Sequence, residues 1–152
     1  GLLHKGLITD GAITVPVGKV SKEATALMKA TKKALELAVK AAKVGNTTGD
    51  IGHAVESFVK PLGYGIVRIL SGHGVGYSVH EDPYVPNFGK PGTGTKLVAG
   101  MVIAIEPMLN LGTDEVCVTE DEYTFITEDG KISAHFEHTV AITEKGPIIL
   151  TK

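Results

Sequence analysis

The strongest pattern along the chain is an amphipathic one between residues 20 and 42. Apolar residues recur there every three or four positions, while lysines occupy most of the opposite side. This period is that of a helix with one buried face. Ser21 is a suitable N-cap, and Gly45 fits just beyond the C-terminal end. We therefore predict a long helix over this segment.

A second, shorter helix is predicted from the apolar stripe between Ile51 and Leu62. Thr48 is its expected N-cap. Pro61 and Gly63 are expected to end it, because proline lacks a backbone N–H and glycine readily leaves the helical conformation.

Short segments rich in Ile, Val and Thr predict strands elsewhere. Residues 1–17 have the pattern of a β-hairpin or a pair of strands, with a turn at Lys5-Gly6. The Pro- and Gly-rich residues 82–94 are expected to form an exposed loop. Further strands are expected at residues 66–70, 101–109, 116–127 and 132–143, with an edge strand at 147–150. This order predicts a single α+β domain, with helices on one face of a largely antiparallel sheet.

Composition narrows the class of protein without naming a function. The hydrophobic fraction is 43%, the charged fraction is 21% and the net charge is -2, which are ordinary values for a globular protein. No basic excess indicates a specific nucleic-acid partner, and no apolar run is long enough to cross a membrane. Cys117 is the only cysteine. A chain without internal disulfides fits a reducing compartment, so we expect a cytoplasmic protein.

Four residues are candidates for chemistry: Asp10, His73, Glu106 and Glu137. Each is polar among apolar or glycine neighbours, and Glu106 ends the apolar run of residues 102–105. A carboxylate buried there needs a cation or a hydrogen-bonded partner. Three carboxylates and one imidazole suit Mn, Fe, Co or Zn better than Ca. Carboxylates can also bridge two cations, which make a nearby water more acidic.

The segments around these residues resemble the motifs of one enzyme family. Residues 71–83 (SGHGVGYSVHEDP) are similar to the histidine motif of type I methionine aminopeptidases. Residues 100–108 (GMVIAIEPM) resemble their first glutamate motif, and residues 136–140 (FEHTV) their second. Residues 7–10 (LITD) resemble the segment that carries one of two aspartate ligands. The motifs occur in order along the whole chain, which makes the set far more specific than any one of them.

This resemblance implies the pita-bread fold, represented here by its C-terminal catalytic part, and removal of methionine from the N-terminus of nascent chains. It implies that Asp10, His73, Glu106 and Glu137 bind two divalent metal ions (Co, Mn, Fe or Zn), with Asp10 and Glu137 serving both ions. Glu106 would also carry a proton from the attacking water to the leaving amine. His80 would contact the substrate and donate a hydrogen bond to the tetrahedral intermediate.

The sequence departs from the family pattern in two respects. Val79 and Tyr123 stand where many members carry Phe and Trp in the methionine pocket, so both are expected substrate contacts in a reshaped pocket. The position of the family's first aspartate ligand falls before Gly1. The family's N-terminal half also supplies a further histidine. Residues 1–152 alone are therefore expected to have weak or no activity unless a separate N-terminal half completes the site.

Taken singly, these residues also have structural explanations. Asp10 fits a hairpin turn, His73 a glycine-rich turn and Glu137 a surface ion pair. Strand alternation directs His138 away from Glu137. The remaining polar candidates are expected to lie outside the catalytic site, with Cys117 as a core thiol: His4, His53, His135 and Cys117.

Two other functions compete with methionine release. The first is cleavage beside proline by an Xaa-Pro aminopeptidase or prolidase of the same fold. The sequence Glu137-His138-Thr139 argues against it, because those relatives tend to carry an acidic pair there. The second is a non-catalytic binding module that retains the fold, for which loss of metal ligands is expected.

Overall fold

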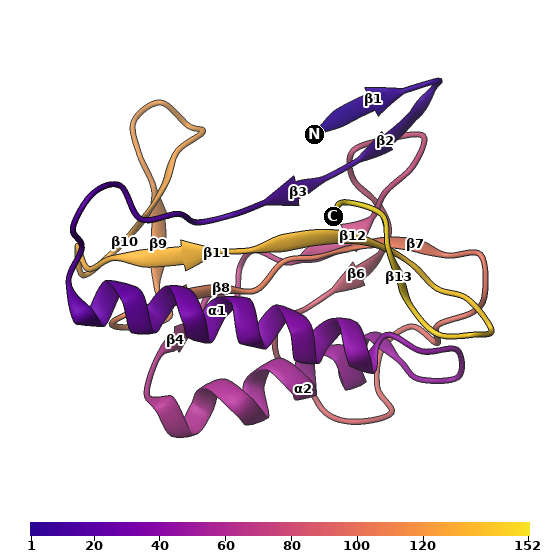
Figure 1. The fold of residues 1–152 in the computed structure, drawn as a ribbon, viewed down its shortest axis with the longest axis horizontal. Helices are drawn as coiled ribbons and strands as arrows, with labels where there is room; N and C mark the ends of the chain where they lie inside the picture. The colour runs from indigo at the N-terminus through magenta and orange to yellow at the C-terminus, as the bar shows by residue number, and fades with distance from the viewer.

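The computed structural model describes all residues 1–152 and has two helices packed on one face of its sheets. Helix α1 (Lys22–Ala41) lies side by side with α2 (Thr48–Val59). It also contacts four strands: β7 (Val102–Ile105), β8 (Met108–Asn110), β11 (Ser133–His135) and β12 (Glu137–Ala141). Figure 1 shows both helices below these strands and the N-terminal hairpin on the opposite side. The predicted α+β architecture with a one-sided helix layer is confirmed.

Both helices begin at side chains that satisfy free backbone N–H groups. Ser21 caps α1 as predicted, because its hydroxyl accepts from the Ala24 N–H at 3.0 Å. The N-cap of α2 is Thr47 and not the predicted Thr48. Thr47 and Asp50 form a capping box, in which each side chain accepts from the other residue's backbone. The Thr48 hydroxyl is buried and accepts from Thr95 instead.

The main sheet is built around two antiparallel strands, β7 (Val102–Ile105) and β12 (Glu137–Ala141). It has six strands in the order β13-β12-β7-β5-β6, with β3 also paired to β12. Its other members are β3 (Gly11–Ala12), β5 (Gly72–Gly74), β6 (Glu81–Val85) and β13 (Ile148–Ile149). The edge strand predicted at residues 147–150 is β13. Strand β6 contradicts the predicted exposed loop, since it is paired and Val85 is buried.

A second sheet continues the first beyond a shared break. It places β8 (Met108–Asn110) between β11 (Ser133–His135) and β4 (Gly65–Ile66). The strands predicted at 101–109 and 132–143 are thus each divided in two. Pro107 has no N–H to donate, and its carbonyl accepts from the Phe136 N–H at 3.4 Å. The segment from β7 to β8 and the segment from β11 to β12 therefore pass from one sheet to the other side by side, at Pro107 and Phe136.

Two hairpins extend from these sheets. The first joins β1 (Leu2–His4) to β2 (Leu7–Thr9) through Lys5 and Gly6, both with positive φ, which confirms the predicted turn. The second joins β9 (Val116–Val118) to β10 (Phe125–Thr127). A single strand over 116–127 was the wrong prediction, because the Asp121 carboxylate accepts from the backbone of Tyr123 and Thr124 and folds the chain back.

The predicted strand at residues 66–70 is also mostly wrong, since only Ile66 of that segment lies in a strand. Helix α2 continues into a short 3₁₀ turn (Lys60–Leu62), and Gly63 ends it in a left-handed conformation. The core lies between the helices and the sheets. Its largest fully buried side chains are apolar ones from both layers: Leu27, Ile51, Leu97, Ile103, Ile105, Leu109 and Ile142.

Gly52 fixes how closely α2 approaches the chain after β6. A methyl group at this position would overlap the carbonyl group of Phe88, which is backbone and cannot turn aside. We expect Gly52→Ala to lower the free energy of unfolding by about 2 kcal/mol, although alanine favours a helix by about 1 kcal/mol over glycine. Urea unfolding tests this, with Ser57→Ala on the exposed side of α2 as the control. A Gly52→Ala protein as stable as the control would contradict the close approach.

Candidate metal centre

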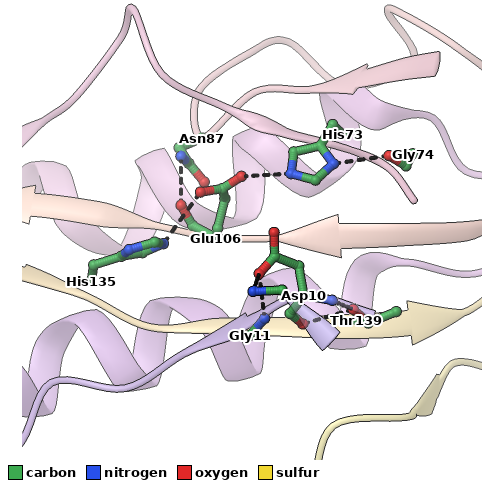
Figure 2. Close-up of polar contacts among 9 residues, drawn as sticks. Asp10, Gly11, His73, Gly74, Asn87, Glu106, His135 and Thr139 are labelled. Carbon is green, nitrogen blue, oxygen red and sulfur yellow. Dashed lines mark hydrogen bonds and ion pairs between the residues drawn. The ribbon is translucent and has the colours of Figure 1, made fainter. Parts of the chain in front are cut away.

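Glu106 lies at the break between β7 and β8, where its side chain is mostly buried. One carboxylate oxygen is 3.4 Å from His73 Nε2, and the other is 3.2 Å from His135 Nε2. Asn87 donates from Nδ2 to the Glu106 backbone carbonyl at 3.1 Å and so satisfies a group that the break leaves free. Figure 2 shows the carboxylate between the two imidazoles.

His73 is a buried residue of β5 with a defined proton position. Its Nδ1 is 2.8 Å from the carbonyl oxygen of Gly74, which can only accept, so Nδ1 carries the hydrogen. In the neutral ring Nε2 then presents a lone pair toward the Glu106 carboxylate. Two electron-rich atoms face each other, and this arrangement suits a cation between them.

Glu137 opens strand β12 and is 5% exposed, and its Oε1 is buried without a hydrogen-bond partner. Burial, followed by the nearby charges of Glu106 and Asp10, raises the pKa of Glu137 to about 8. Such a carboxyl group is costly as a lone anion, whereas a divalent cation would stabilise its charged form. The unpaired oxygen and the crowded carboxyl groups therefore fit a metal centre.

Asp10 lies between β2 and β3 and reaches the same place from the other end of the chain. Its backbone N–H donates to the Thr139 hydroxyl at 2.8 Å, and that hydroxyl donates to the Asp10 carbonyl at 2.7 Å. The paired contacts hold Asp10 beside β12. Gly11 also donates to one carboxylate oxygen of Asp10, which leaves the other oxygen free (Figure 2).

The four predicted ligand residues come together in two overlapping groups. Ligand atoms of Asp10, His73 and Glu137 lie within 4.8 Å of one another. Those of Glu106, His135 and Glu137 do the same. Glu137 belongs to both groups, which is the geometry that two neighbouring cations sharing one carboxylate require.

His135 is the residue that sequence analysis missed, since it was placed outside the catalytic site. The available signal was its spacing: His135 precedes Glu137 by two, and residues two apart on a strand face the same side. His138, one residue beyond Glu137, faces away as predicted and bonds through Nδ1 to the Thr151 hydroxyl. Cys117 is exposed and is not the predicted core thiol.

A cavity of about 360 Å³ adjoins the cluster and has mainly apolar walls. His80 lines it together with Glu106 and His135, and the His80 ring packs edge-on against His73 with ring centroids 4.4 Å apart. Val79 and Tyr123 are not among the lining residues and are 39% and 87% exposed. The apolar part of the wall comes mainly from these side chains: Val67, Leu70, Met108, Val116, Phe125 and Ile126.

A cluster of carboxylates and imidazoles beside an apolar cavity defines a candidate metal-dependent hydrolase. The model of metallopeptidase family M24 matches residues 1–144, so the chain belongs to that family. Membership implies binding of divalent metal. Neither helix has the length and apolar content that crossing a bilayer needs.

The comparisons also bear out the resemblance to methionine aminopeptidases. The chain is 47% identical to the methionine aminopeptidase of Clostridium acetobutylicum, covering 99% of this chain and 60% of that protein. The methionine aminopeptidase structure from Thermotoga maritima is 45% identical with a TM-score of 0.96, at 99% and 60% coverage. Prolidase from Pyrococcus furiosus is 30% identical, with a TM-score of 0.78 and coverage of 99% and 39%. The predicted pita-bread fold is thereby confirmed.

The chain spans about 60% of the length of the methionine aminopeptidases that it matches.

Without divalent cations, the free energy of unfolding should fall as the pH rises from 7 to 8. The pKa of Glu137 is raised from 4.5 to about 8 in the folded protein, which therefore keeps a proton that the unfolded chain has lost. The expected slope is up to about 1.4 kcal/mol per pH unit. Burial lowers the pKa of His138, so above pH 7 this imidazole is largely neutral in both states. Urea unfolding in EDTA measures the slope.

Glu137→Gln is the matched control for this slope, because the amide keeps the size of the side chain and cannot titrate. Its stability should vary less between pH 7 and 8 than that of the wild type. Parallel curves for the two proteins would show that Glu137 is not the titrating group.

Proposed function

We propose that this chain is the catalytic part of an enzyme that hydrolyses the N-terminal methionyl peptide bond of nascent polypeptides, with two divalent cations as cofactors. The main support is the pair of ligand groups that share buried Glu137 beside an apolar cavity. The likeness to methionine aminopeptidases supports the choice of substrate. New polypeptides emerge in the cytoplasm, and we propose that compartment as the site of action.

In this proposal Asp10, His73, Glu106 and Glu137 hold the cations, which supply Lewis acidity at the carbonyl group and make water more acidic. The mixed set of oxygen and nitrogen donors favours Co, Mn, Fe or Zn. The cations would also bind the free N-terminal amine of a peptide through its nitrogen lone pair. Only the N-terminal residue has a free amine, so the site would favour the first peptide bond over internal ones.

Two side chains act on the reacting groups in this proposal. Glu106 takes a proton from the attacking water and delivers it to the leaving amine, for which a carboxylate beside the cluster is suited. His80 donates a hydrogen bond to the carbonyl oxygen as negative charge develops there. Its ring already packs against the His73 ring.

The apolar cavity is the proposed binding place for the methionine side chain. Its walls supply apolar contact, while Glu106, His80 and His135 lie at its polar part. We propose Val79 and Tyr123 as further substrate contacts. Both are partly or largely exposed, so a bound peptide could cover them.

The activity is tested by measuring methionine release from a Met-Gly-Met peptide with Co or Mn added. The protein assayed is the enzyme of which this chain is the catalytic part. We expect His80→Ala to lower kcat by about 100- to 1000-fold, because it removes a donor to the developing charge. We expect Glu106→Gln to lower kcat/KM by at least about 100-fold, because it removes a ligand and a proton carrier. His53→Ala, which changes an exposed imidazole on α2, is the control.

The same assay separates the competing functions. If the enzyme releases the first residue from Xaa-Pro peptides and leaves Met-Gly-Met intact, the proposed function is wrong and the enzyme is a proline-directed peptidase. Metal binding without turnover of either peptide would favour a binding module.

A polypeptide limited to residues 1–152 should show weaker turnover than a full-length methionine aminopeptidase, by about 100-fold. Large apolar side chains are exposed on its N-terminal hairpin, including Leu2, Leu3 and Leu7. Relatives are also longer by some two fifths of their length. Single-turnover assays with a relative's N-terminal half added in trans measure the difference. Equal turnover with and without that half would refute it.

A further inference from the structure

His135 has an unexplained position at the metal centre. It is the last residue of β11, and its Nε2 is 3.2 Å from one carboxylate oxygen of Glu106. Its ligand atom also lies within 4.8 Å of those of Glu106 and Glu137. The other ligand group contains an imidazole as well, that of His73.

The Nε2 atom of His135 is buried and has no hydrogen-bond partner, although Glu106 is close. The ion-pair distance is met, but the geometry of a hydrogen bond is not. The in-plane direction of Nε2, which carries its lone pair or hydrogen, is therefore unused. A buried ring nitrogen without a partner is uncommon, and a neutral imidazole nitrogen is the commonest protein ligand of metal ions.

The backbone of His135 is held on both sides. The Thr14 hydroxyl accepts from the His135 N–H at 3.0 Å and donates to its carbonyl oxygen at 2.7 Å. On its other edge, His135 is in register with Met108 of β8. A side chain on so constrained a backbone loses little further freedom when it binds a ligand, which favours a preorganised donor.

We propose that His135 Nε2 is a direct ligand of the cation held by Glu106 and Glu137. This inference rests on the metal centre of the proposed function. Each ligand group then contributes one imidazole, His73 to one and His135 to the other. An imidazole donor shifts the preference of this position toward Co, Fe and Zn and away from Mn.

The test uses cation binding and not turnover. Calorimetry with Co²⁺ should show that His135→Ala weakens one of two binding steps by at least about 10-fold. X-ray absorption of the Co²⁺-loaded protein should show one imidazole donor fewer. Free imidazole should restore both the affinity and the donor count of His135→Ala, because the removed ring leaves room for it. His53→Ala is the control and should match the wild type.

A purely structural role for His135 could weaken binding, but it would not change the number of imidazole donors. An unchanged donor count with a weakened affinity would therefore overturn the proposal, as would an affinity equal to that of the wild type. If circular dichroism shows that His135→Ala is unfolded, His135→Gln provides the same comparison with a side chain closer in size. Absence of Co²⁺, Zn²⁺ and Mn²⁺ binding to the wild type would instead remove the proposed function itself.

Discussion

The buried and unpaired carboxyl group of Glu137 is the constraint on which the rest of the site depends. It is 5% exposed, and burial, followed by the charges of Glu106 and Asp10, raises its pKa. Without a cation this cluster stores electrostatic and desolvation cost, which a protein retains at functional sites. The nitrogen lone pair of His73, which faces Glu106, adds to the same demand. Positive charge is the missing component that would satisfy all of these groups.

The clustered side chains are positioned by the break between the two sheets, where β7 gives way to β8 and β11 to β12. Glu106 follows the end of β7, and Glu137 begins β12 directly after Phe136. In a continuous pair of strands, side chains would alternate between the helix layer and the opposite face along the full length. The break changes the direction of the chain beside the cavity, so carboxylates and imidazoles from several strands converge there. The helices contribute none of the clustered carboxylates and imidazoles, and they cover the apolar face of these strands.

Residue type and motif spacing were sufficient to predict the helices and the one-sided architecture, and to select four expected ligand residues that the structure brings together. Features that depend on strand register were not accessible in this way. The role of His135 depends on where β11 ends and β12 begins. Its spacing of two from Glu137 was a signal, but the apolar pattern does not mark the break between these two strands. Val116 to Thr127 likewise has the composition of one strand, and only the side-chain contacts of Asp121 divide it. The predicted N-cap of α2, Thr48, was one residue too late. Its hydroxyl accepts a hydrogen bond from the Thr95 N–H, and Thr47 caps the helix instead.

The contacts that complete the centre join the two ends of the chain. Asp10 meets Thr139 across 129 positions, and Thr14 meets His135 across 121. Closing loops of this length costs entropy before any contact is gained, so we expect these contacts to form late in folding. A partly folded chain has helices and local hairpins but no centre. Cations that bind only the finished fold would stabilise it by mass action, and their uptake would report that the chain has closed.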